Sequence, residues 1–208
     1  VVAVTFNGKG PFRLILDTGA AVTVLDESLA RELGLPRNAE LDEIRLGPVT
    51  VRRVSAFALP IAKMFNVSDM PRGVLSASAF PGLLVSIDYP RMEVGLRPGA
   101  LAEADGKTIF SYRGADLPSV PVKVAGREIT VHLDTGAPYA LALPTRFMKE
   151  LPLDAEPVRK GTARTHAGEL PIYAATLSGD VQLGEFTVAT RDLRFTDVVP
   201  GMFAVPKG

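Results

Sequence analysis

The chain has 208 residues, of which 47% are hydrophobic and 22% are charged, as in an ordinary soluble globular protein. Lysine plus arginine total 23 and aspartate plus glutamate total 23, so no net charge favours nucleic acid or an acidic membrane as a partner. The absence of cysteine excludes disulfides, thiolate nucleophiles and zinc–thiolate sites. No run approaches the roughly 18 apolar residues of a membrane span. The compartment stays open, with a periplasmic or secreted location favoured over the cytoplasm.

The first half of the chain predicts short strands joined by tight turns. Residues 2–6 alternate between apolar and smaller or polar side chains, and the N-G-K-G run at 7–10 predicts a hairpin turn into a strand that ends at Asp17. A helix is expected over residues 26–34, between an aspartate N-cap and a glycine stop. Residues 60–72 are predicted to be irregular. Further strands are expected at 41–46, 49–59, 83–88 and 92–96, with a short helix after 73–76.

The second half repeats this pattern from residue 120 onward. Residues 120–124 alternate as residues 2–6 do, and an apolar strand again ends in an aspartate, Asp134, which lies 117 residues after Asp17. We therefore expect an N-terminal lobe at 1–97, a connection at 98–118 and a C-terminal lobe at 119–208. The second lobe looks incomplete at its C-terminus, because no counterpart of the 73–96 segment follows.

Each repeat carries the same four residues directly after its apolar strand. The two copies are Asp17-Thr18-Gly19-Ala20 and Asp134-Thr135-Gly136-Ala137. For a single copy, an Asx turn is a sufficient explanation, in which the aspartate accepts backbone N–H groups and the glycine forms the turn. Two copies in matching places favour one site built from two halves, since ionised carboxylates that end apolar strands are costly unless they are hydrogen-bonded or paired.

A pair of facing carboxyl groups has a specific chemistry. Both cannot be ionised cheaply, so the pair shares one proton over a wide pH range. The ionised member takes a proton from a water held between them, and the protonated member donates a hydrogen bond to a substrate carbonyl. Aspartic proteases are the established example of enzymes that use such a dyad. No cofactor and no metal enter this chemistry.

The sequence resembles the retropepsin-like aspartic proteases, in the single-chain, two-lobed form found among bacterial aspartyl proteases. The motif at 17–20 and the V-T-V-L run at 22–25 match the family signature closely, whereas the second motif is followed by a looser P-Y-A-L at 138–141. The V-L-S run at 74–76 resembles the family's hydrophobic-hydrophobic-glycine element, with a serine in place of the glycine. The resemblance implies an all-β fold of two similar acid-protease lobes with short helices, related by a pseudo-twofold axis.

The resemblance also implies residue roles. Asp17 and Asp134 are the expected catalytic dyad. The expected supporting residues are two threonines that interlock and two glycines that line the cleft, namely Thr18, Thr135, Gly19 and Gly136. The candidate substrate-binding residues are Ala20, Ala137, His166 and Gly168, the last two in a hairpin at 163–170 that is either a flap over bound peptide or an ordinary surface hairpin.

The sequence thus predicts an aspartic endopeptidase that acts on peptide or protein substrates, with a monomer favoured over an obligate dimer. The alternative is a peptide-binding or scaffold protein that keeps the protease fold without turnover, suggested by the incomplete second lobe. His132 lies within a predicted strand, so packing is favoured over a site role. Asp88 also ends a strand, but no Thr-Gly follows it, so a turn is expected there.

Overall fold

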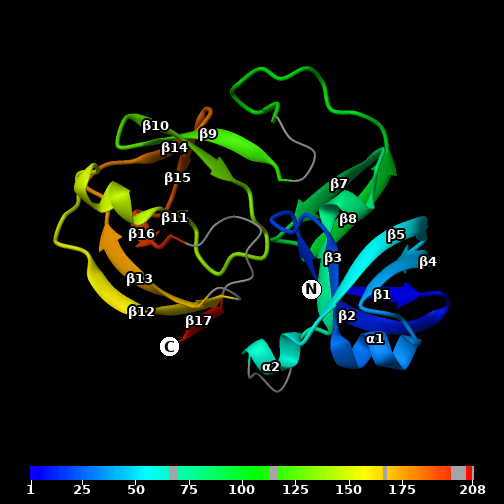
Figure 1. Cartoon of the computed structure of the whole chain (residues 1–208). Helices are drawn as coiled ribbons and strands as arrows, with labels where there is room; N and C mark the ends of the chain where they lie inside the picture. The colour runs from blue at the N-terminus through cyan, green and yellow to red at the C-terminus, as the bar shows by residue number, and fades with distance from the viewer. Residues whose placement is uncertain (66–69, 113–116, 166–167, 198–204, 208) are drawn as a thin grey trace. The chain divides into compact units, whose positions relative to one another are not determined.

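The chain folds into two compact units in a computed structural model, which describes residues 1–65, 70–112, 117–165, 168–197 and 205–207 (Figure 1). Unit 1 comprises Val1–Ala102 together with the short segment Asp134–Gly136, and unit 2 comprises Glu103–Leu133 and Ala137–Gly208. The fold is all-β with a few short helices, as the sequence predicted. The pseudo-twofold relation and the lobe boundaries at 97 and 119 stay predictions.

Unit 1 is built on a closed barrel with the strand order β1-β2-β6-β3-β5-β4. The strands are β1 (Val2–Phe6), β2 (Lys9–Asp17), β3 (Thr23–Asp26), β4 (Asn38–Leu46), β5 (Val49–Leu59) and β6 (Gly73–Ser76). The alternation predicted at the N-terminus is confirmed, because Val4 and Phe6 point into the core and are fully buried. Asn7 and Gly8 form the first hairpin turn with φ of 48° and 78°, the conformation that an Asn-Gly pair favours.

Strand β6 lies between β2 and β3 and completes the barrel. It runs parallel to β2, with Leu75 opposite Leu16, and antiparallel to β3, with Val74 opposite Val24. Leu75 is fully buried in a core that also contains Leu14 and Leu25. Because β3 has β5 on its other side, all four of its residues are buried. Strand β2, which ends at Asp17, has β1 along one edge and β6 along the other, so both of its edges are paired.

Two helices lie at one end of this barrel (Figure 1). Helix α1 (Glu27–Leu33) begins after the N-cap Asp26 and ends at Gly34, whose φ of 74° is the left-handed C-cap conformation, as predicted. Helix α2 (Ile61–Phe65) falls in the stretch 60–72 that was predicted to be irregular, and the prediction was wrong for residues 61–65. Asp26 joins the two helices, since its carboxylate accepts hydrogen bonds from the N–H groups of Ser28 at 2.8 Å and Ala62 at 2.9 Å.

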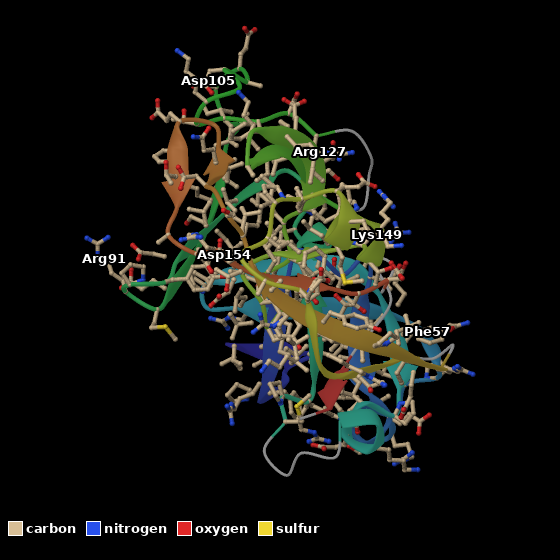
Figure 2. All side chains as sticks on the ribbon, turned by 90° about the vertical axis from the view of Figure 1, so that its left-hand side faces the viewer. Phe57, Arg91, Asp105, Arg127, Lys149 and Asp154 are labelled. Carbon is tan, nitrogen blue, oxygen red and sulfur yellow. The ribbon has the colours of Figure 1, made fainter. Side chains whose placement is uncertain are left out.

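After the short 3-10 helix η1 (Ala77–Ala79), β7 (Leu83–Asp88) and β8 (Glu93–Pro98) form a separate two-stranded hairpin. Alternate residues of the hairpin, including Val85 and Leu96, pack against the barrel core. Arg91 projects from its tip (Figure 2) and pairs with Asp88 at 2.8 Å. Asp88 thus ends β7, and its Oδ1 accepts the N–H of Arg91 at 3.0 Å in the turn that follows, as expected.

Unit 2 contains two sheets rather than one closed barrel among its described residues. One has the order β10-β9-β14-β15 and the other β11-β16-β13-β12-β17. The strands are β9 (Ser119–Val124), β10 (Arg127–His132), β11 (Ala142–Leu143), β12 (Val158–Thr165), β13 (Gly168–Thr176), β14 (Val181–Leu183), β15 (Phe186–Val188), β16 (Asp192–Phe195) and β17 (Val205–Lys207), with the 3-10 helix η2 at Thr145–Lys149. Both sheets contribute to one core, which includes Val124, Leu143, Leu177 and Phe195.

The segment predicted to connect the lobes is partly folded onto unit 2. The carboxylate of Asp105 accepts N–H groups from Lys107, Thr108 and Ile109, each at 2.8 Å. The carbonyl of Lys107 in turn accepts the N–H of Glu185 at 3.3 Å, beside the β14–β15 turn. This loop therefore packs as part of the second unit.

Candidate active site

Asp17 ends β2 at the point where β2 and β6 run side by side. Its Cα partner across the parallel pair is Ser76. Asp17 is half-buried, and its Oδ1 accepts the N–H of Gly19 at 2.7 Å. In the second motif, Oδ1 of Asp134 accepts the N–H of Gly136 at 2.8 Å. Each aspartate is thus held by the glycine two residues later, the turn geometry expected of a single copy of the motif.

The segment Asp134–Gly136 is part of unit 1, and the two threonines join it to the first motif. The N–H of Thr18 donates to Oγ1 of Thr135 at 3.1 Å, and the N–H of Thr135 donates to Oγ1 of Thr18 at 3.1 Å. Oγ1 of Thr135 also donates to the carbonyl of Leu16 at 2.8 Å. These reciprocal bonds hold the two Asp-Thr-Gly turns against each other.

The two glycines permit a close approach that any side chain would prevent. A Cβ atom on Gly19 would lie 2.7 Å from both carboxylate oxygens of Asp134. A Cβ on Gly136 would lie 2.6 Å from Oδ2 of Asp17. Each glycine therefore faces the aspartate of the other motif, and the two carboxyl groups converge on one place.

This convergence changes the titration of the pair. Burial, and then the negative charge of Asp134, raise the pKa of Asp17 to about 6, and a hydrogen bond between the two carboxyl groups acts in the same direction. The N–H groups of Gly19 and Gly136 partly offset this rise by stabilising the ionised form. The pair therefore holds a proton at pH values where an isolated aspartate has lost it.

A comparison with known protein families points to the same pair of motifs. A family model described as aspartyl protease matches residues 2–40 and 120–202, which together make up more than half of the chain and include both motifs. The chain belongs to the aspartyl protease family. A search of curated proteins found no match. The predicted retropepsin-like relationship is confirmed at the level of the family.

In this member of the aspartyl protease family, two serines outside the motifs fix the first turn. Oγ of Ser76 donates to the carbonyl of Ala20 at 2.5 Å and lies 2.7 Å from Oγ of Ser78. Ser78 in turn donates to the carbonyl of Ala21 at 3.1 Å. The sequence marked Ser76 only as a departure from glycine. Its bond to Ala20 depends on pairing across 56 residues and was not predicted.

The predicted substrate-binding residues lie in different environments, and their role stays a prediction. The side chain of Ala20 is buried, whereas Ala137 is exposed. Gly168 begins β13, and His166 lies outside the described residues. The other histidine, His132, is exposed at the end of β10, where Nδ1 lies 2.9 Å from Oγ of Ser119.

No group of three or more histidine, aspartate and glutamate side chains within the described ranges is placed to hold a metal ion. No helix in this part of the chain is long and apolar enough to cross a membrane.

Proposed function

We propose that this protein is an aspartic endopeptidase in which Asp17 and Asp134 activate a water molecule against a peptide bond. The observation that carries the proposal is the convergence of the two carboxyl groups, each within reach of the glycine of the other motif. A carboxyl pair that shares one proton supplies a general base and a general acid at the same time. No covalent intermediate forms, because water is the nucleophile.

The surroundings of the two carboxyl groups favour different roles. Asp17 is half-buried with a raised pKa and is the member that carries the proton, whereas Asp134 is exposed and is assigned the role of the base. Asp134 takes a proton from the water as the water oxygen bonds to the carbonyl carbon, and Asp17 gives its proton to the carbonyl oxygen. When the tetrahedral intermediate collapses, the C–N bond breaks and the amine leaves with the proton from Asp134. A hydroxyl group of the intermediate returns its proton to Asp17 as the carbonyl of the product acid forms.

The substrate class follows from family membership, and we propose peptides in extended conformation. A surface groove on unit 1 begins directly after the first motif and is lined by Ala21, Val22, Ser55 and Ser78. We assign a substrate side chain to this groove. The β12–β13 hairpin is our candidate flap, and shortening it at Thr165–Glu169 is expected to weaken peptide binding; unchanged kinetics would identify an ordinary surface hairpin.

Incubation with an unfolded protein tests this function. Wild-type protein is expected to cleave it near pH 5, and pepstatin is expected to stop cleavage. Asp17→Asn and Asp134→Asn should each lose activity, because neither variant keeps both an acid and a base. Asp88→Asn is the matched control, since Asp88 also ends a strand but pairs with Arg91 at the hairpin tip. Wild-type activity in either motif variant would refute the dyad.

A peptide-binding protein without turnover is the second candidate. The observation that favours it is the exposure of the residue just before the second motif: Leu133 is 42% exposed, whereas Leu16, at the same place before Asp17, is 6% exposed. Binding of unfolded protein without cleavage at any acidic pH would support this candidate. Two converging carboxyl groups lower the stability of the fold. This counts against the second candidate, because a protein without turnover gains nothing from them.

A further inference from the structure

The groove beside the first motif carries positive charge in its lining. The lining comes from the segment just after the motif, from β5 and from the residues around η1. The groove has a volume of about 290 Å³. Pockets for drug-sized ligands begin at roughly 300 Å³, so the size of this groove suits a single substrate side chain. Within the described residues the lining includes two arginines, Arg52 and Arg53, and no aspartate or glutamate.

A change of phase in β5 brings both arginines to the outer face of the barrel. Successive side chains of a regular strand point to opposite faces. Val51 packs against the core and Val54 is buried in it, so the two residues between them are both exposed. The φ of Arg53 is 60°, a left-handed conformation that is unfavourable for a residue with a side chain. Strain of this kind gathers at active sites and ligand clamps, which makes this part of β5 a candidate for binding.

Both guanidinium groups can bind a further carboxylate beside their neighbouring glutamates. Nη2 of Arg52 lies 3.6 Å from Oε2 of Glu43, and Nε of Arg53 lies 3.4 Å from Oε1 of Glu40. The two arginine side chains are 77% and 81% exposed, and exposed ion pairs of this kind are weak. A guanidinium has five N–H donors in a planar fork, so one contact with a glutamate leaves donors for a substrate carboxylate.

A serine joins the groove to the catalytic turn. Ser78 lines the groove, and its hydroxyl group donates to the carbonyl of Ala21 at 3.1 Å. Ala21 also lines the groove and lies four positions after Asp17 in the sequence. The wall of the groove and the turn that carries Asp17 are therefore parts of one hydrogen-bonded segment. A side chain held in the groove thus helps to fix the position of the substrate backbone at the dyad.

We propose that this groove selects substrates with an aspartate or glutamate side chain at one fixed position from the scissile bond. Arg52 and Arg53 are the specificity-determining residues. The inference rests on the proposed endopeptidase function and narrows its substrate class to peptides that carry a carboxylate at that position. The same two positive charges repel a lysine or arginine side chain, so the groove discriminates against basic residues there.

A neutral decapeptide in which a single glutamate is moved through every position is the probe, with the same set carrying glutamine as the reference. Wild-type protein gives the rates of cleavage, and the full chain carrying Asp17→Asn gives binding without turnover. Both are measured at about pH 5.5, where a glutamate side chain is mostly ionised. At one placement, glutamate is expected to raise kcat/KM and to tighten binding about three- to tenfold over glutamine, the effect of two exposed charge contacts. Salt at about 1 M should reduce the difference.

Variants of the protein locate the selectivity. The double variant Arg52→Gln/Arg53→Gln is expected to lose the difference between glutamate and glutamine peptides, and Arg52→Glu/Arg53→Glu should favour lysine at the same placement. Arg45→Gln is the matched control and should keep the preference for glutamate. Arg45 lies on the same hairpin, but its Nε donates to the carbonyl of Gly47 at 2.9 Å.

Two results would overturn the inference: no placement at which glutamate is favoured, or a preference that survives in Arg52→Gln/Arg53→Gln. Failure of the proposed function looks different. In that case wild-type protein cleaves none of the peptides, and binding to Asp17→Asn still shows whether the groove selects a carboxylate.

Discussion

Replacing Asp17 by asparagine is expected to abolish activity and yet stabilise the fold at neutral pH. Burial and Asp134 raise the pKa of Asp17 from 3.8 to about 6. Asparagine cannot ionise, and its Oδ1 can still accept the Gly19 N–H that Asp17 accepts at 2.7 Å. The variant therefore keeps the turn and removes only the penalty of an ionised pair.

The magnitude follows from linkage. A shift of about two pKa units corresponds to about 3 kcal/mol at most. Because the carboxyl group is partly exposed and screened by solvent, we expect about 1–2 kcal/mol. Below about pH 4 both folded and unfolded chains carry the proton, and the penalty is absent. As the pH rises from about 4 to about 6 the unfolded chain ionises first, so wild-type stability falls and the advantage of the variant grows.

Urea unfolding of wild type and Asp17→Asn at pH 4 and pH 8 measures this difference. The variant is expected to be more stable at pH 8 by about 1–2 kcal/mol and nearly equal at pH 4. Asp88→Asn is the control. Its stability relative to wild type should not increase with pH, because this substitution removes only an exposed ion pair with Arg91. A variant less stable than wild type by the same amount at both pH values would refute the reasoning.

Three further substitutions test the contacts around the motifs. Thr135→Val removes the bond to the Leu16 carbonyl and the acceptor for the Thr18 N–H, and should lower the free energy of unfolding by about 1–3 kcal/mol in urea. Asp26→Ala should lower the free energy of unfolding by about 1–3 kcal/mol in the same measurement, because the N–H groups of Ser28 and Ala62 lose their acceptor. Asp26→Asn should lower it less. Gly19→Ala should lower kcat/KM by about 100-fold in a peptide assay, since its Cβ displaces the Asp134 carboxylate; unchanged kinetics would contradict the close approach.

Local patterns in the sequence predicted most of the individual elements. Alternation and the Asn-Gly turn located β1 and β2, and the aspartate and glycine caps located α1. Helix α2 escaped prediction because it has only five residues and its stabilising contact comes from Asp26, far away in the sequence. Short helices depend on such tertiary contacts more than on propensity.

Long-range pairing was the part that the sequence could not supply. The insertion of β6 between β2 and β3 joins Ile15 to Val74, and no local pattern encodes that register. For the same reason the sequence showed Ser76 only as a serine in place of the family's glycine. Its hydroxyl group in fact donates to the carbonyl of Ala20 and so fixes the turn after Asp17. The convergence of the two motifs was anticipated because their repetition carried the information.

The pH dependence of kcat/KM on a peptide substrate tests the central claim most directly. Our account requires one proton on the Asp17–Asp134 pair, so activity should follow a bell-shaped profile and fall as the pH rises through about 6. Activity that continues to rise through pH 8, or no hydrolysis anywhere between pH 3 and pH 8, would contradict catalysis by this carboxyl pair.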